Sequence, residues 1–498
     1  MKKIVKISEN IKTQMRLRNS QGGGFYMIRK VKIFSAIMLV AVFIFLISSC
    51  APKATVSSTE EAEGTEETAA ATSAETEAAN FAGVKLTIPA MEGWSCIKPI
   101  IDRAGEFKSK TGIEVEYNEF PFFDMYEKQY TEAAAQTGAY DTAMVDHEGI
   151  PTLRESGAML PLNDFIKRDF GDVEKWKASM YPVINVCEDA EGNILFIPFH
   201  ANEEYIAYQE NLFNDPAEKE AFKAEYGYDL QPPTSYQQLI DIAKFFTRDT
   251  NNDGEIDLWG MTYGGEFRSA LFAWFNIATS MGMDGTRYVD DSGNILLREG
   301  TKDYEASLAA MQYWYDLLYK YKVVPLNSVE IGHAQVWEMW KKGQIAMSQW
   351  WWGDYWTNPD FTLAGPVKSA PFPRNEGVEN CGWGSWWTFG IYKSSPNPEA
   401  AWEFLKWVIS EEMQSAMSEG SGQASPFTAY TQKFAENGWV APALLEELSR
   451  ASYPASVPEN VQVHETIRTH LGEVLTNAAT PSDAMKALST DIQDILGE

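Results

Sequence analysis

Tryptophan is concentrated in two short stretches of the chain, and these side chains offer the most distinctive chemistry. The first stretch is SQWWWGDYW, residues 348–356, and the second is GWGSWWTFG, residues 382–390. Each indole presents a large flat apolar face that stacks well on a flat partner. Asp354 adds a carboxylate to the first stretch. The pattern favours a binding surface with aromatic platforms and a polar rim; ordinary packing of the indoles is the alternative.

Acidic and imidazole side chains follow an apolar segment with the pattern of a strand. The segment YDTAMVDHEG carries Asp146, His147 and Glu148 at its end. Open α/β sheets bind ligands at the loops that follow their strands. A carboxylate in such a loop can accept hydrogen bonds from two adjacent hydroxyl groups. We expect these three side chains to face a polar ligand, with solvated loop charge as the alternative.

A third group of polar side chains has the spacing of a calcium loop. DTNNDGEIDLWG, residues 249–260, places oxygen-bearing side chains at alternate positions and a glycine at the turn, as an EF-hand loop does. The glutamate that normally closes such a loop is missing, because Gly260 stands there. An Asx-rich turn is the alternative. The spacing predicts a structural calcium site, with no cofactor otherwise required, and its ligands would be Asp249, Asn251, Asp253, Glu255 and Asp257.

Alternating strand and helix patterns must position these groups. VKLTIPA places Val84, Leu86 and Ile88 on one face, and IEVEYNEF, residues 113–120, alternates in the same way. A helical stretch between them stops at Gly112. Strands separated by helices predict an α/β fold with a mainly parallel sheet and helices on both faces.

The clearest helical pattern is SSPNPEAAWEFLKWVISEEMQSAM, residues 394–417. Asn397 is placed to cap this helix, and Pro398 suits its first turn. About 420 residues follow the N-terminal region, which is more than one hydrophobic core usually serves. The length therefore predicts two lobes.

The N-terminal region has the pattern of a secretion signal. Basic residues precede an unbroken apolar run from Ile33 to Ile47, which is too short for a comfortable membrane span. The sequence ISSC that follows resembles a bacterial lipobox, so Cys50 is predicted to be lipidated and to anchor the protein to the membrane. We interpret residues 1–49 as a signal region whose true start is Met27 and which is cleaved before Cys50.

Residues 50–80 contain almost only Ala, Ser, Thr and Glu, a composition that predicts a disordered acidic tether.

The chain has 41 Lys and Arg against 70 Asp and Glu, so its surface repels phosphate backbones and excludes nucleic acid as a partner. Cys96, Cys187 and Cys381 lack a Cys-x-x-Cys spacing. They leave room for at most one disulfide, and we expect buried thiols.

Several segments occur together in an order that resembles one protein family. They include GEFKSKTGIEVEY, DTAMVDHEGIPTLRESGAMLPLNDFI, ILFIPFHANEEYIAYQENLF, WKKGQIAMSQWW and PNPEAAWEFLKWVISEEMQ. The order is similar to that of family 1 extracellular solute-binding proteins of ABC importers, the carbohydrate-binding group that includes maltose-binding protein. The resemblance implies a periplasmic-binding-protein-like fold, with a ligand cleft between two α/β lobes joined by hinge crossovers. The implied N-lobe is 81–198 and 374–418, and the implied C-lobe is 199–373 and 419–498.

The same resemblance implies a set of ligand-binding residues. A pyranose ring exposes C–H groups on its faces and hydroxyls at its rim, which suits aromatic platforms with polar partners. Consecutive residues of an extended segment alternate faces, so Trp351 is favoured within the first tryptophan stretch. Asn202 is favoured at the crossover PFHANEEYIAY. The full set is Trp350, Trp351, Trp352, Asp354, Trp383, Asp146, His147, Glu148, Asn202, Glu203, Trp94 and Glu92.

Trp386 and Trp387 are expected in the sheet, and Trp274 fits a core position as well as a ligand platform. The expected function is therefore a monomeric, lipid-anchored, extracytoplasmic protein that delivers a sugar to ABC transporter permease subunits and has no enzymatic activity. A glycoside hydrolase would share the aromatic cleft and paired carboxylates. A structural lipoprotein or adhesin and a binding protein for a non-sugar solute are further alternatives.

Overall fold

The computed structural model describes residues 81–262, 267–285, 288–290, 292–329, 333–350, 356–379, 381–452, 457 and 459–497. All of them belong to one unit, Glu77–Glu498. The predicted signal region, the lipidated Cys50 and the tether lie outside these residues and stay predictions.

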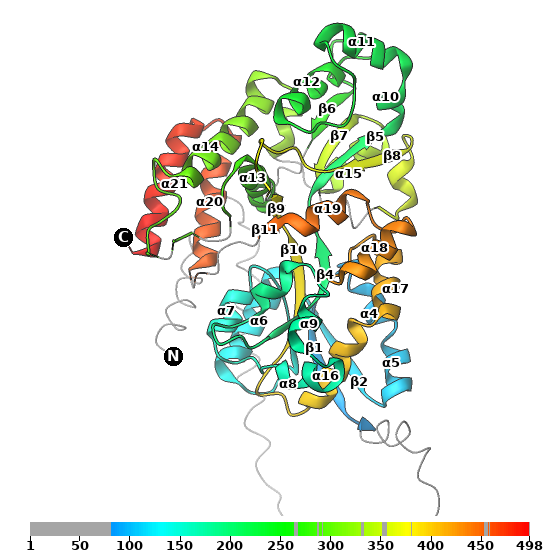
Figure 1. Ribbon diagram of the computed structural model, residues 1–498, viewed down its shortest axis with the longest axis vertical. Helices are drawn as coiled ribbons and strands as arrows, with labels where there is room; N and C mark the ends of the chain where they lie inside the picture. The colour runs from blue at the N-terminus through cyan, green and yellow to red at the C-terminus, as the bar shows by residue number, and fades with distance from the viewer. Residues whose placement is uncertain are drawn as a thin grey trace, which may run out of the picture. The chain divides into compact units, whose positions relative to one another are not determined.

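Short strands and helices alternate along most of the unit (Figure 1). The strands are β1 (Lys85–Met91), β2 (Glu114–Phe120), β3 (Thr142–Asp146), β4 (Phe196–Asn202), β5 (Tyr205–Gln209), β6 (Trp259–Thr262), β7 (Ile345–Trp350), β8 (Val367–Ala370), β9 (Cys381–Trp383), β10 (Ser385–Ile391) and β11 (Ala451–Ser452). The helices are α4 (Lys98–Asp102), α5 (Ala104–Thr111), α6 (Phe122–Ala135), α7 (Ile150–Glu155), α8 (Asn163–Phe170), α9 (Val173–Lys177), α10 (Glu210–Asn214), α11 (Pro216–Tyr226), α12 (Tyr236–Phe246), α13 (Phe267–Met281), α14 (Lys302–Tyr315), α15 (His333–Lys341), α16 (Pro398–Val408), α17 (Glu411–Ser421), α18 (Thr428–Glu436), α19 (Ala443–Arg450), α20 (Asn460–Leu475) and α21 (Pro481–Leu496).

The first hydrophobic core gathers buried side chains between Leu86 and Phe199 and between Trp387 and Met417. Strands β1 and β2 pair in parallel, and their inward residues Leu86 and Ile88 are fully buried as the alternation predicts. Strand β10 lies between β3 and β4 and is antiparallel to both. The prediction of a mainly parallel sheet is therefore wrong, because β10 enters this core from a distant part of the chain and runs against its neighbours.

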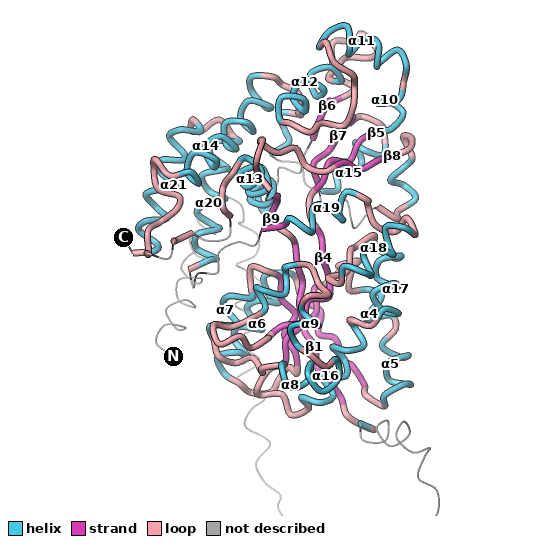
Figure 2. Tube along the Cα trace, viewed as in Figure 1, coloured by secondary structure: helices cyan, strands magenta, loops and turns pink. Residues whose placement is uncertain are grey.

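The second hydrophobic core gathers buried side chains from Ile206 to Phe372 and from Val463 to Ile492. Its sheet has the order β6-β7-β5-β8, in which β6 and β7 are parallel and β5 is antiparallel to β7 and β8. Helices α13, α14, α20 and α21 pack together beside it. Figure 2 shows strands inside each core with helices around them.

A third hydrophobic cluster lies where the chain passes from one core to the other. It joins Tyr205 and Trp386 to helices α18 and α19 through side chains such as Phe434 and Leu444. The strands β4 and β5 are separated by only Glu203 and Glu204, so the crossover is short, and each of the two strands is paired with a neighbour. The lobe boundaries given above stay predictions.

The helix predicted over residues 394–417 is divided in the structure. Helix α16 ends at Val408, and α17 begins after Ser410, whose hydroxyl accepts a hydrogen bond from the Met413 amide. The serine caps a new helix because its side-chain oxygen satisfies an amide of the first turn. Asn397 stands at the start of α16 but makes no side-chain cap, so that prediction is also wrong. Across the described residues, no helix has both the length and the apolar character that a membrane span requires.

Candidate functional site

The loop after β3 is held from within the first core. The Tyr126 hydroxyl donates to Asp146, and the Glu148 amide donates to the same Asp146 oxygen at 2.9 Å. Burial, followed by the charge of Asp146, raises the pKa of Tyr126 well above its ordinary value, so the phenol remains a donor. Gly149 is required beside this ring, since a Cβ there would lie 2.4 Å from Tyr126 Cε1. The three predicted residues Asp146, His147 and Glu148 are all buried, and their role toward a ligand stays a prediction.

Glu148 and His147 also contact helices of the second core. Arg468 Nη2, on α20, donates to Glu148 Oε1 at 2.7 Å, and His464 Nδ1 lies 3.4 Å from the same oxygen. Burial lowers the pKa of His464, which favours its neutral form. The His147 ring meets the edge of Phe272 on α13, with 5.7 Å between ring centroids. The loop therefore connects the two cores as well as lying among the candidate ligand residues.

The crossover between β4 and β5 carries a row of buried polar side chains. Asn202 Oδ1 accepts from the Glu203 amide at 3.0 Å, and Glu203 Oε1 accepts from the Glu204 amide at 2.9 Å. His200, Asn202, Glu203 and Glu204 are each 3% exposed or less. So many buried polar groups in one short segment favour a binding site over ordinary packing, because taking polar groups out of water costs free energy.

Glu204 was not among the predicted residues, yet it forms the centre of a polar network. Gln349 Nε2, near the end of β7, donates to Glu204 Oε2 at 2.7 Å, and the Asn276 side chain on α13 lies beside Glu203 and Glu204. Burial raises the pKa of Glu204 to about 7 and that of Glu203 well above its ordinary value. Gly382 packs over the network, since a Cβ there would lie 2.3 Å from Glu203 Oε1. Glu204 could have been predicted from the sequence, because it directly follows the predicted residue Glu203 in the crossover segment.

The aromatic candidates have different environments. Trp94 is half-buried and packs against Trp387, with 4.6 Å between ring centroids, and against His200 at 5.2 Å. Glu92 is exposed beside it. Trp386 and Trp387 are buried in β10, which confirms that they belong to the sheet. Trp274 is fully buried in the second core.

The first tryptophan stretch, residues 348–356, lies mostly outside the described residues. Trp351, Trp352 and Asp354 fall there, as do the side chains of Trp350 and Trp383. Strand β7 leads directly into this stretch, and Tyr205 of the crossover pairs with Trp350 in the sheet. The backbone therefore brings the first tryptophan stretch to the crossover, whereas the roles of its side chains stay predictions.

The predicted calcium loop is folded around its own carboxylates. Asp249 accepts hydrogen bonds from four backbone amides, the shortest of which is 2.6 Å long and comes from Asn252. Asp257 accepts hydrogen bonds from Thr250 and Asn251. The hydrogen bond from the Gly254 amide is the main cause that lowers the pKa of Asp249. These contacts are those of the Asx-rich turn. In the described part of the chain no three His, Cys, Asp or Glu side chains are grouped to hold a metal ion; calcium stays a prediction.

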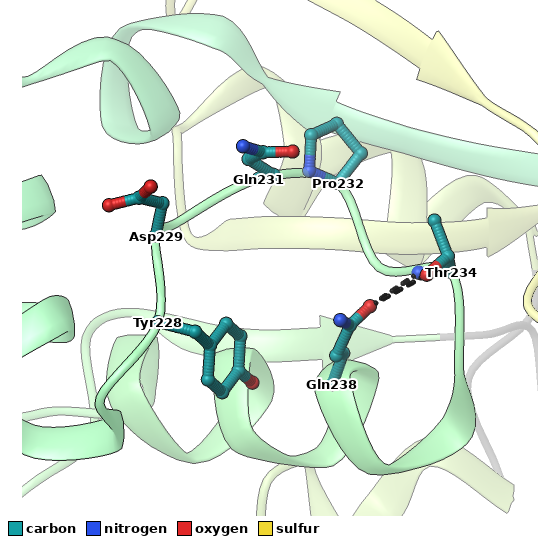
Figure 3. Close-up of a pocket in the computed structure, with 6 residues that line it drawn as sticks. All are labelled: Tyr228, Asp229, Gln231, Pro232, Thr234 and Gln238. Carbon is teal, nitrogen blue, oxygen red and sulfur yellow. Dashed lines mark hydrogen bonds between the residues drawn. The ribbon is translucent and has the colours of Figure 1, made fainter.

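A hollow of about 240 Å³ lies elsewhere, between the end of α11 and the start of α12 (Figure 3). Gln238 Oε1 accepts two hydrogen bonds from Thr234, each 2.9 Å long, and closes one side of it. Half of its lining residues are exposed, namely Asp229, Gln231 and Thr234, and none is buried. Its shallow polar lining differs from the enclosed, largely apolar pockets that bind small molecules.

Comparison with known proteins agrees with this architecture. The family model described as bacterial extracellular solute-binding protein matches residues 97–415, more than half of the chain. A maltose-bound MalE3 of T. maritima is similar, with a TM-score of 0.66, 20% identity, and coverage of 83% of this chain and 100% of that one. A solute-binding protein of Agrobacterium radiobacter K84 in complex with ribitol has a TM-score of 0.65 and 21% identity over 83% and 99% of the two chains.

An arabinooligosaccharide-binding protein of Halalkalibacterium halodurans is 22% identical over 302 residues, which cover 59% of this chain and 60% of that protein. This match thus spans about three fifths of the length of the curated relative. The solved structures have the two-lobed fold of MalE-like proteins, and the two cores described above correspond to that architecture. The chain is therefore a member of the bacterial extracellular solute-binding protein family.

Proposed function

We propose that the protein binds a carbohydrate or polyol at the crossover between its two cores and delivers it to the permease subunits of an ABC transporter. The observation that carries this proposal is the row of buried polar side chains at Asn202, Glu203 and Glu204, next to the backbone of the first tryptophan stretch. Amide and carboxyl groups match the hydroxyls of a sugar rim, and indole faces match its C–H faces.

The similar proteins support this ligand class. The T. maritima protein is bound to maltose, the Agrobacterium protein to ribitol, and a Listeria monocytogenes protein with a TM-score of 0.65 to cycloalternan. These ligands differ in size but all present adjacent hydroxyl groups. The shared feature is polyhydroxylation, which the buried polar side chains at the crossover can recognise.

Binding without catalysis is part of the proposal. The family is one of solute-binding proteins, and a hydrolase would need two carboxyl groups placed on either side of a glycosidic bond. Glu203 and Glu204 are adjacent in the chain and share the partner Asn276, which is a geometry for holding a ligand rather than for flanking a bond. We further propose that the protein acts as a monomer, anchored outside the membrane through lipidated Cys50.

A thermal-shift and calorimetric panel tests the function. Maltose, maltotriose, an arabinooligosaccharide, ribitol and mannitol would be compared with amino acids and a dipeptide as controls. A ligand that binds only the folded protein raises its melting temperature by an amount set by the ratio of ligand concentration to Kd. We expect a shift with at least one carbohydrate or polyol and unchanged ligand after prolonged incubation. A shift with the amino acids or dipeptide alone would contradict the ligand class, and hydrolysed sugar would contradict the non-catalytic role.

A further inference from the structure

Gln423 carries a buried side-chain amide that has no hydrogen-bond partner among the residues that the structure describes. Its side chain is 1% exposed, and neither Nε2 nor Oε1 makes a hydrogen bond to any of these residues. It follows Gly422, the residue that caps the C-terminus of α17 in the left-handed conformation with φ of 71°. Buried polar groups in folded proteins are almost always paired, so an amide with both ends unpaired requires an explanation.

The position of Gln423 relative to the crossover gives that explanation. Ala424 and Ala201 exchange two backbone hydrogen bonds of 3.0 and 3.2 Å in an antiparallel bridge. In such a bridge the residue before Ala424 lies beside the residue after Ala201, which is Asn202. Gln423 is therefore a neighbour of Asn202, although 221 positions of sequence numbering separate them.

The two side chains also share a face. Ala201 and Ala424 are both fully buried in the third hydrophobic cluster. Side chains of an extended segment alternate between its two faces, so Gln423 and Asn202 are directed away from that cluster. Asn202 is also the first residue of the buried polar group Asn202, Glu203 and Glu204 in the crossover.

We propose that Gln423 is a ligand-binding residue, whose amide binds a hydroxyl-bearing group of the solute. This inference rests on the proposed function and adds a residue and a contact chemistry to it. A hydroxyl group is both donor and acceptor, so two adjacent hydroxyls can satisfy Nε2 and Oε1 at the same time. A carboxylate or an ammonium ion could satisfy only one end of the amide.

The chain offers a matched control in Gln209. This residue is also a glutamine, is 2% exposed, and has no hydrogen-bond partner at Nε2 or Oε1 within the described ranges. It lies at the far end of β5, opposite Val367 of β8, and not at the bridge with Asn202. Gln209→Met and Gln423→Met therefore remove the same group from equally buried places, and only the second removes it from the proposed site.

The experiment measures calorimetric Kd values for the panel sugar or polyol that the full-length wild-type protein binds best. We expect Gln423→Met to weaken binding at least tenfold. The melting temperature of the unliganded protein should not fall, because removing an amide that makes no hydrogen bond removes no hydrogen bond from the folded state. Gln209→Met should change Kd less than twofold. Gln423→Glu, of almost identical shape, keeps the acceptor and loses the donor, and is expected to weaken binding by less than Gln423→Met.

The outcomes separate this inference from the proposed function. If the wild-type protein binds no member of the panel, the proposed function is wrong. If the wild-type protein binds but Gln423→Met and Gln423→Glu both retain its Kd within twofold, the amide contacts only water and this inference is overturned. Equal weakening by Gln209→Met would overturn it as well, since the effect would then follow from any lost buried amide. Should Gln423→Met fail to fold, the Gln423→Glu result decides.

Discussion

Replacing Arg468 tests whether the contact between the loop after β3 and helix α20 holds the protein together. Arg468 is 4% exposed and donates to Glu148 across the two cores, and its other ion pair, with Glu465, stays within α20. Arg468→Met keeps most of the side-chain volume but leaves the Glu148 carboxylate buried without its cation. His464 is no substitute at neutral pH, because burial lowers its pKa.

The magnitude follows from the burial of the pair. Removing one partner of a buried ion pair costs about 3–5 kcal/mol, because the remaining charge is left unsolvated. An unfolding entropy of about 2.1 cal/mol/K per residue over about 420 residues converts this to a melting temperature roughly 3–6 °C lower, if unfolding is two-state. Glu465→Gln removes the second ion pair of the same arginine, whose carboxylate is partly exposed to water, so about 1 kcal/mol or less is expected.

Scanning calorimetry and urea unfolding would measure these changes for Arg468→Met, Glu465→Gln, Glu148→Gln and the double variant Glu148→Gln/Arg468→Met. Removing both charges should recover at least half of the loss, since a neutral pair leaves no unpaired charge. The reasoning is refuted if Arg468→Met costs no more than Glu465→Gln. It is also refuted if the double variant is as unstable as the sum of the single variants.

Four further predictions concern separate parts of the chain. Because burial raises the pKa of Glu204 from 4.5 to about 7, the folded protein keeps a proton there that the unfolded chain releases. Stability should therefore fall as the pH rises from about 4.5 to about 7, and Glu204→Gln should remove about 3 kcal/mol of that fall in urea titrations. Chelation should lower the melting temperature if the Asp249 loop binds calcium, and elemental analysis would detect the ion. Cys50→Ser should release the protein from membranes in fractionation without changing its Kd for ligand. Trp351→Ala should weaken sugar binding by ~2 kcal/mol, roughly thirtyfold by calorimetry, with partial recovery in Trp351→Phe.

Local patterns predicted the first part of the fold well. Leu86 and Ile88 are buried on one face of β1, and Gly112 ends α5 in the left-handed conformation, because both features depend on residues close in sequence. The direction of β10 could not be predicted in this way. Strand β10 pairs with β3 and β4, although nearly 200 residues of sequence separate it from β4. The alternation of apolar and polar residues within a strand does not indicate which distant strand will pair with it.

The same distinction applies to the candidate site. Asp146 was predicted from the end of a strand, and Asn202 and Glu203 were predicted from the family resemblance. The structure finds all three buried. Gln423 was missed, since a glutamine between a glycine and an alanine has no pattern of its own. Only the bridge between Ala201 and Ala424 brings it to Asn202, and that bridge is a tertiary contact.

The candidate residues lie on the segments through which the chain passes between its cores, and this placement bears on how binding is linked to lobe position. Asn202 ends β4 in the first core, and two residues later β5 begins in the sheet of the second. Gln423 similarly follows α17, whose Met413 and Met417 pack in the first core, and precedes the third cluster. A solute that bridges Asn202 and Gln423 would therefore bind to two crossings at once. Because a ligand shifts an equilibrium only by its differential affinity for the two states, contacts on the crossings themselves are the most direct way for a solute to favour one arrangement of the lobes.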